Sequence, residues 1–171
     1  MASTAPEFIP ETTQDDPVQP SSLDIQGRMH QISPVFTEAE LRRLQRYGKV
    51  CHYAGGATLF EAGSSSFGML VVLSGHVAVT RHEGLGRTSL MREIGPGHFI
   101  AEVAQLSGRP ALVNGHAVGD VDVLVISSES LRALIVAEAE MGERIVRALI
   151  LRRVALIESN SGGPVLVGPR G

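Results

Sequence analysis

The stretch GPGHFIAEVAQLSGRPALV, residues 95–113, decides the fold expected of this chain. The turn residues 95–97 end an apolar strand, and the apolar pair Phe99-Ile100 follows. Residues 101–106 then predict a single helical turn, which Ser107, Gly108 and Pro110 end. One turn of helix between strands buries little and makes few hydrogen bonds for its nucleation cost. We therefore expect it to direct backbone N–H groups, with the Glu102 carboxylate beside them, toward an anionic ligand.

This stretch resembles the phosphate-binding cassette of the cyclic nucleotide-binding domain family. The family pattern is Gly-Asp-x-x-Gly-Glu-[Leu/Val]-[Ala/Ser] and, further on, Arg-[Ala/Ser/Thr]-[Ala/Thr]. Gly97 matches the first glycine, Glu102 the glutamate, and Val103 and Ala104 the pair after it. The resemblance covers about residues 37–157 and includes the glycine-flanked strands of residues 56–77.

The cassette departs from the pattern at three positions. His98 replaces the usual Asp, Ala101 replaces the usual Gly, and Ala111 stands where the family carries its phosphate-binding Arg. Arg109 lies two residues too early, and a shifted register would place Pro110, which has no N–H, at a position where the family uses a backbone donor.

The resemblance implies a role for each cassette residue. Glu102 would contact the ribose hydroxyl, and the N–H groups of Val103 and Ala104 would contact the phosphate. The residues expected to form the ligand site are Gly97, Ala101, Glu102, Val103, Ala104, Arg109, Ala111 and Leu112. A missing bidentate Arg costs a few kcal/mol, or about a hundredfold in affinity. We therefore expect cyclic AMP and cyclic GMP to bind weakly or not at all.

Short apolar runs separated by glycine-bearing turns predict a β-sandwich or barrel. The expected strands are 49–53, 58–61, 69–73, 77–81, 89–93, 113–117 and 121–126, with the pair 99–100 between the last turns. The resemblance specifies the fold further. It implies a mainly β protein built on an eight-stranded jelly-roll barrel, with an N-terminal helix and two C-terminal helices.

The helices are predicted from their caps and periodicity. Thr37, followed by Glu40, begins a helix that Gly48 ends, and Ser127 or Ser128 caps a helix over residues 131–139. Residues 141–158 form a longer helix with a wide apolar band, which favours packing on the barrel and on a second chain. The band consists of Ile145, Val146, Leu149, Ile150, Val154, Leu156 and Ile157, and the expected dimer rim consists of Arg144, Arg147, Arg152 and Arg153. The alternative, a helix docked only on its own barrel, has equal weight.

The chain divides into three parts. Residues 1–33, rich in Pro, Ser, Thr and Asp, predict a mobile leader in which Phe8, Ile9, Leu23 and Ile25 are the residues able to pack on the domain. Residues 34–158 form the cyclic nucleotide-binding-like domain. Residues 159–171 form a linker and the first strand, 165–167, of a missing downstream domain. That arrangement resembles bacterial thioredoxin-reductase-like flavoenzymes, and FAD and NADPH would be cofactors only of such a parent protein.

Composition excludes several classes of function. Fifteen Lys and Arg are scattered among eighteen acids for a net charge of −3, which argues against a nucleic-acid or membrane surface. No apolar run has membrane-spanning length, so the cytoplasm is the expected location. The single cysteine and six histidines form no CxxC or His-x-His pair, and no nucleophile elbow occurs. We expect no catalytic site, metal or cofactor in this chain.

Two functions follow from these features. The first is a regulatory sensor module with a degenerate cyclic nucleotide site. The second is a module without ligand that dimerises and positions a downstream enzyme domain.

Overall fold

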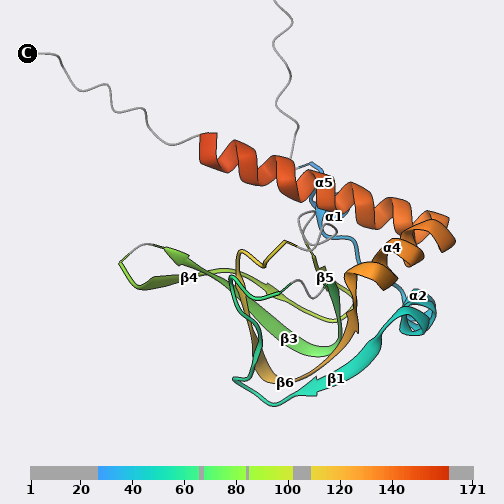
Figure 1. Ribbon diagram of the computed structural model, residues 1–171, viewed down its shortest axis with the longest axis horizontal. Coiled ribbons are helices and arrows are strands. Elements are labelled where there is room, and N and C mark those ends of the chain that lie inside the picture. Colours follow the sequence, from blue (N-terminus) through green and yellow to red (C-terminus); the bar gives the residue numbers. More distant parts are fainter. Residues whose placement is uncertain (1–26, 66–67, 84, 102–108, 162–171) are drawn as a thin grey trace, which may run out of the picture.

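The computed structural model describes residues 27–65, 68–83, 85–101 and 109–161. These residues form a strongly bent antiparallel sheet, with the long helix α5, Ala139–Ser161, lying across one side of it (Figure 1). The fold class, mainly β of jelly-roll type with flanking helices, is confirmed.

In the part of the chain that the structure describes, the sheet has six strands in the order β1-β6-β3-β4, with β2 also paired to β6 and β5 to β3. Their bounds are β1 Lys49–Tyr53, β2 Thr58–Phe60, β3 Met69–Glu83, β4 Arg87–Ile94, β5 Phe99–Ile100 and β6 Asn114–Ile126. All of these pairs are antiparallel.

Within the described residues, the predicted eight-stranded barrel is corrected to an open sheet of six strands, because two expected turns are bends within continuous strands. β3 runs through Gly75, and its register with β6 shifts on both sides of Ser74. Gly75 has φ +75°, and a Cβ there would lie 2.3 Å from the Asp120 carbonyl oxygen. Across the sheet, Gly119 has φ +66° within β6. Glycines therefore bend the two long strands at the same level, where a turn was expected.

The first part of β3, residues 69–72, is buried on both of its faces. Met69 and Val71 belong to a cluster that the helices cover, and Leu70 and Val72 belong to a second cluster inside the bent sheet. The covered cluster also contains Phe36, Leu44, Phe99, Ala101, Leu124, Ile126, Leu131, Leu134, Met141, Ile145, Ala148 and Leu149. The core therefore consists of two layers separated by the sheet.

The predicted N-terminal helix and the two predicted C-terminal helices are confirmed. Helix α2, Glu38–Leu44, begins with the capping box of Thr37 and Glu40 and continues into the 3-10 turn η1, Gln45–Tyr47. Helix α4, Ser128–Ala137, begins at Ser127, whose side chain accepts a hydrogen bond from the Ser130 N–H.

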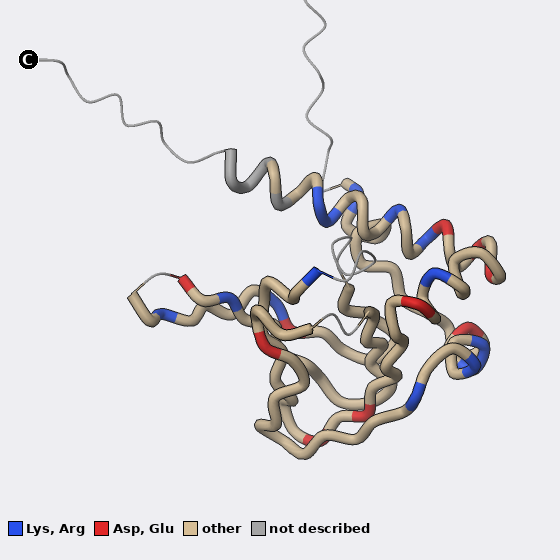
Figure 2. The backbone as a smooth tube through the Cα atoms, in the orientation of Figure 1, with Lys and Arg blue, Asp and Glu red and all other residues tan. Residues whose placement is uncertain are grey.

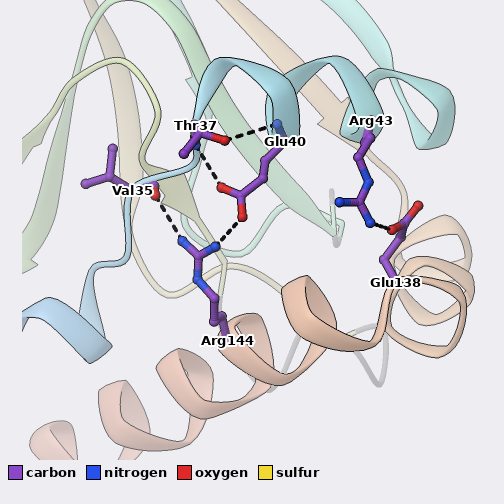
Figure 3. A network of polar contacts seen from close by, with 6 residues as sticks. All are labelled: Val35, Thr37, Glu40, Arg43, Glu138 and Arg144. Carbon is purple, nitrogen blue, oxygen red and sulfur yellow. Dashed lines mark hydrogen bonds and ion pairs between the residues drawn. The ribbon is translucent and has the colours of Figure 1, made fainter.

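Two ion pairs join α2 to the C-terminal helices (Figure 3). Figure 2 shows the charged residues along the backbone. Arg43 of α2 pairs with Glu138, between α4 and α5. Arg144 of α5 pairs with Glu40 and donates a hydrogen bond to the Val35 carbonyl oxygen at 2.9 Å. The helices at the two ends of the domain are thus held together on one side of the sheet.

Part of the predicted leader is ordered on the domain. Helix α1, Met29–Ile32, lies against α5, and Ile32 is buried. Phe8, Ile9, Leu23 and Ile25, as well as the strand expected at residues 165–167, lie outside the described residues. The domain boundaries at residues 34 and 158 stay predictions. Within the described ranges, no helix is both long and apolar enough to cross a membrane.

Candidate functional site

The turn at residues 95–97 is fixed between the sheet and the segment before α2. The Gly97 N–H donates to the Val72 carbonyl oxygen at 2.9 Å, and the Gly97 carbonyl oxygen accepts from the Phe36 N–H at 2.8 Å. Gly97 is buried with φ +80°, and a Cβ there would lie 2.8 Å from a methyl group of Val35. A glycine is therefore required at the position that matches the first glycine of the family pattern.

The chain enters the cassette from β5, which pairs Phe99 with Val71 and Ile100 with Leu70. Ala101 follows and is buried. Glu102, Val103 and Ala104, which carry the predicted ribose and phosphate contacts, lie outside the described residues, as does most of the helical turn expected at 101–106. Their roles stay predictions.

The chain leaves the cassette through Arg109, Ala111 and Leu112. Arg109 is exposed, and Leu112 is 55% exposed. Ala111 is 2% exposed and belongs to the cluster inside the bent sheet. Its N–H donates to the Ser64 carbonyl oxygen at 3.2 Å, and its carbonyl oxygen accepts from the Gly63 N–H at 2.8 Å. The position that carries an Arg in the family pattern is therefore held at the inner layer of the core by a methyl side chain.

Arg152, which is predicted at the rim of a dimer, contacts the entry to the cassette directly. Arg152 of α5 donates hydrogen bonds to three carbonyl oxygens, those of Ile32 at 2.9 Å, Phe99 at 3.2 Å and Ala101 at 3.2 Å. Its guanidinium also lies 4.4 Å from the centre of the Phe99 ring, a cation-π contact. Arg152 thus joins α1, the entry to the cassette and α5.

Arg144 and Arg152, which are predicted at the rim of a dimer, both bind their own domain through their side chains, and their place at a rim stays a prediction. A sequence signal for Arg152 did exist. Met141, Ile145 and Leu149 follow one another at helical spacing on the buried face, and position 152 continues that series. An Arg on the buried face of a helix indicates a partner rich in carbonyl oxygens or carboxylates.

His98, at the position of the usual Asp, lies in a small basic cluster. Its Nδ1 is 3.3 Å from the Ser33 hydroxyl, which also accepts a hydrogen bond from Arg92 at 3.1 Å. Burial lowers the pKa of His98 below its ordinary value, and the positive charges of Arg92 and Arg152 lower it further. The imidazole therefore favours its neutral form in the folded domain.

The broad apolar band of α5 divides into two faces. Ile145 and Leu149 are buried against the domain, whereas Val146, Ile150 and Val154 line an open groove of about 650 Å³ between α5 and α1. The other residues that line the groove are Arg28, Gln31, Glu143, Arg147 and Leu151. Of the described residues proposed to form a dimer surface, this outward set and Ile157, which is 53% exposed and does not line the groove, are accessible. The Leu156 side chain lies outside the described part.

Comparisons with known proteins agree with this architecture. The family described as "Cyclic nucleotide-binding domain" matches residues 50–138. A curated relative, the "CRP-like cAMP-activated global transcriptional regulator" of Mycobacterium tuberculosis, is 25% identical over 97 residues, which are 57% of this chain and 43% of that protein. This chain therefore spans less than half the length of that relative.

Two solved structures show the same fold. The catabolite activator protein of Thermus thermophilus has a TM-score of 0.64 at 23% identity, covering 73% of this chain and 58% of the other. Oxidized CprK in complex with o-chlorophenolacetic acid has a TM-score of 0.60 at 16% identity, covering 74% and 53%.

Proposed function

Because the chain belongs to the cyclic nucleotide-binding domain family, we propose that it is the regulatory sensor module of a larger protein, with a degenerate site that binds cyclic AMP and cyclic GMP weakly or not at all. The observation that carries this proposal is the burial of Ala111. Its main chain is paired with residues 63 and 64, and its side chain supplies a methyl group where the family pattern has a guanidinium.

Arg109 does not replace the missing cation in this proposal. Its side chain is exposed, and it is followed by Pro110, which has no N–H to donate. A cyclic phosphate needs a cation together with several N–H donors, and the loss of a bidentate Arg lowers affinity by about a hundredfold or more. Glu102 on the ribose, and the N–H groups of Val103 and Ala104 on the phosphate, remain the proposed contacts of any nucleotide that binds.

Calorimetric titration of the chain with cyclic AMP and with cyclic GMP tests the proposal. We expect no saturable heat, or a dissociation constant well above the low micromolar range. A dissociation constant in the low micromolar range or below would show that the site is competent despite Ala111.

A second function, assembly without a ligand, is favoured by the outward face of α5. Val146, Ile150 and Val154 repeat every four residues on this face, and Ile150 is 53% exposed. Pairing of two such faces over a few hundred Å² gives several kcal/mol at about 25 cal/mol per Å² before the entropy of association is subtracted. We therefore propose a homodimer through residues 141–158, with Arg144, Arg147, Arg152 and Arg153 at its rim.

The proposal that this chain is one module of a larger protein is supported by its relative. The curated relative named above is a transcriptional regulator that is cAMP-activated, and this chain matches 43% of it. The thioredoxin-reductase-like parent, with FAD and NADPH, rests only on residues 165–167, whereas the Mycobacterium tuberculosis relative is a regulator rather than an enzyme. The absence of a nucleic-acid surface is proposed for this chain alone and not for its parent.

A further inference from the structure

The groove between α1 and α5 lies where the N-terminal leader joins the domain. Arg28 and Gln31 form its α1 side, and Val146, Ile150 and Val154 form an apolar floor on α5. Residue 26 is followed by Gly27 and then by Arg28, which lines the groove. The part of the leader outside the described residues, 1–26, is therefore attached at the mouth of the groove. Any leader residue that binds there does so within the same chain, at a high effective concentration.

The leader and the groove are complementary in charge. Residues 1–26 contain five acidic residues and no Lys or Arg; the acids are Glu7, Glu11, Asp15, Asp16 and Asp24. The groove is lined by two Arg side chains, Arg28 and Arg147, and one carboxylate, Glu143, which pairs with Arg147. Arg28 has no carboxylate partner among the ion pairs of the described residues.

The dimensions also match. From Glu143 to Val154 the helix advances about 17 Å, at about 1.5 Å per residue. An extended segment of residues 22–26 also spans about 17 Å, at about 3.3 Å per residue. Within such a segment, Leu23 and Ile25 project to the same side because they are two residues apart. Two branched apolar side chains then meet the apolar floor, and Asp24 projects to the opposite side, toward solvent.

We propose that the leader segment 22–26 binds in the α1–α5 groove of its own chain, with Leu23 and Ile25 on Val146, Ile150 and Val154. The leader covers the surface that the second copy would use, so it restrains self-association. This regulatory part rests on the homodimer proposed above, whereas the binding of the leader does not. If the leader occupies the groove about nine tenths of the time, about one protomer in ten is free to pair. Because both protomers must release the leader, the dimer is then weakened about a hundredfold.

Two variants of the 171-residue chain test the binding directly. L23D/I25D removes the apolar contacts, and the matched control T12D/T13D adds the same two charges elsewhere in the leader. The measurement is the methyl NMR spectrum of Val146, Ile150 and Val154 in dilute protein. We expect these three methyl signals to move in L23D/I25D and to stay at their wild-type positions in T12D/T13D. Unchanged signals in L23D/I25D, or equal changes in both variants, would overturn the proposal.

Sedimentation of the same three proteins tests the regulatory part. We expect L23D/I25D to dimerise about a hundredfold more tightly than the wild type, and the control to match the wild type. A dimer constant that is the same in all three proteins overturns the restraint. If no protein dimerises at any concentration, the proposed homodimer is wrong, and the methyl spectra still decide whether the leader binds. Methyl signals that depend on protein concentration and not on Leu23 and Ile25 would assign the groove to a second copy.

Discussion

The Arg152 guanidinium lies 4.4 Å from the centre of the Phe99 ring and donates a hydrogen bond to the Phe99 carbonyl oxygen at 3.2 Å. A single side chain of α5 therefore contacts both the ring and the backbone of the strand that leads into the cassette. Since the same guanidinium binds the carbonyl oxygens of Ala101 and Ile32, a movement of the cassette entry relative to α5 has to break several of these contacts.

Arg152→Met should lower the free energy of unfolding by about 2–4 kcal/mol, because it leaves carbonyl oxygens of buried residues without a donor. Arg153→Met is the matched control, since Arg153 is the neighbouring residue on the same helix and should change stability by no more than about 0.5 kcal/mol. Urea denaturation of both variants measures the difference. Equal losses in the two variants would contradict the role assigned to Arg152.

Ala111→Arg should improve cyclic nucleotide affinity by about a hundredfold, because it supplies the charge-assisted bidentate contact that the family pattern has at this position. Leu112→Arg places the same charge on the adjacent, exposed residue and should give no gain. Calorimetric titration of both variants with cyclic AMP measures the effect. If Ala111→Arg folds and binds no better than Leu112→Arg, position 111 is not the phosphate position.

Ile150→Glu with Val154→Glu should make the chain monomeric, because it puts two charges on the outward face of α5 while leaving the buried face intact. Leu149 is unsuitable for this test, since it is 1% exposed and its replacement would damage the core. Val136→Glu is the control, because Val136 is 85% exposed on α4 and does not line the groove. Sedimentation over a range of concentrations measures the mass of each variant. Each variant is tested once with the wild-type leader and once with the L23D/I25D leader. A dimer that survives Ile150→Glu with Val154→Glu would place the assembly surface elsewhere.

When the pH falls from about 7.5 to about 5.5, the free energy of unfolding should fall more in the wild type than in His98→Asn. The folded pKa of His98 lies below its ordinary value of 6.5, so protonation below about pH 6.5 favours the unfolded chain. Above that pH the imidazole is neutral in both states and contributes no pH dependence. Denaturation of both proteins at the two pH values measures the difference. A smaller loss in the wild type than in His98→Asn would mean that the folded pKa is raised.

The strands and helices followed well from the sequence, because local signals specify them. Glycines flank nearly every run of apolar residues, and the capping box of Thr37 and Glu40 lies where the pattern placed it. The strand count failed at Gly75 and Gly119, since a glycine with positive φ occurs both in turns and in bends of a continuous strand. Only pairing across the sheet distinguishes these two cases.

The site was predictable to a smaller extent. The motif singled out Gly97 and Ala111 but not the contacts that surround them, and Arg152 lies about fifty residues farther along the chain and acts through carbonyl oxygens, which every residue has. A motif search identifies side chains that bind a ligand. It does not identify a side chain that recognises the backbone around them.

The pairing of β6 has a consequence for the order in which the domain forms during synthesis. β1, β2 and β3 all pair with β6, although they precede it by many residues; Lys49 pairs with Val125 and Met69 with Ile126. Until residues 114–126 have been made, the strands present can form only the pairs of β3 with β4 and β5. Such distant pairings make folding slow, because long loops must close before the contacts form. The nascent domain therefore exposes the strand edges of β1 and β2 until the last strand arrives, and in this interval it is most prone to aggregate.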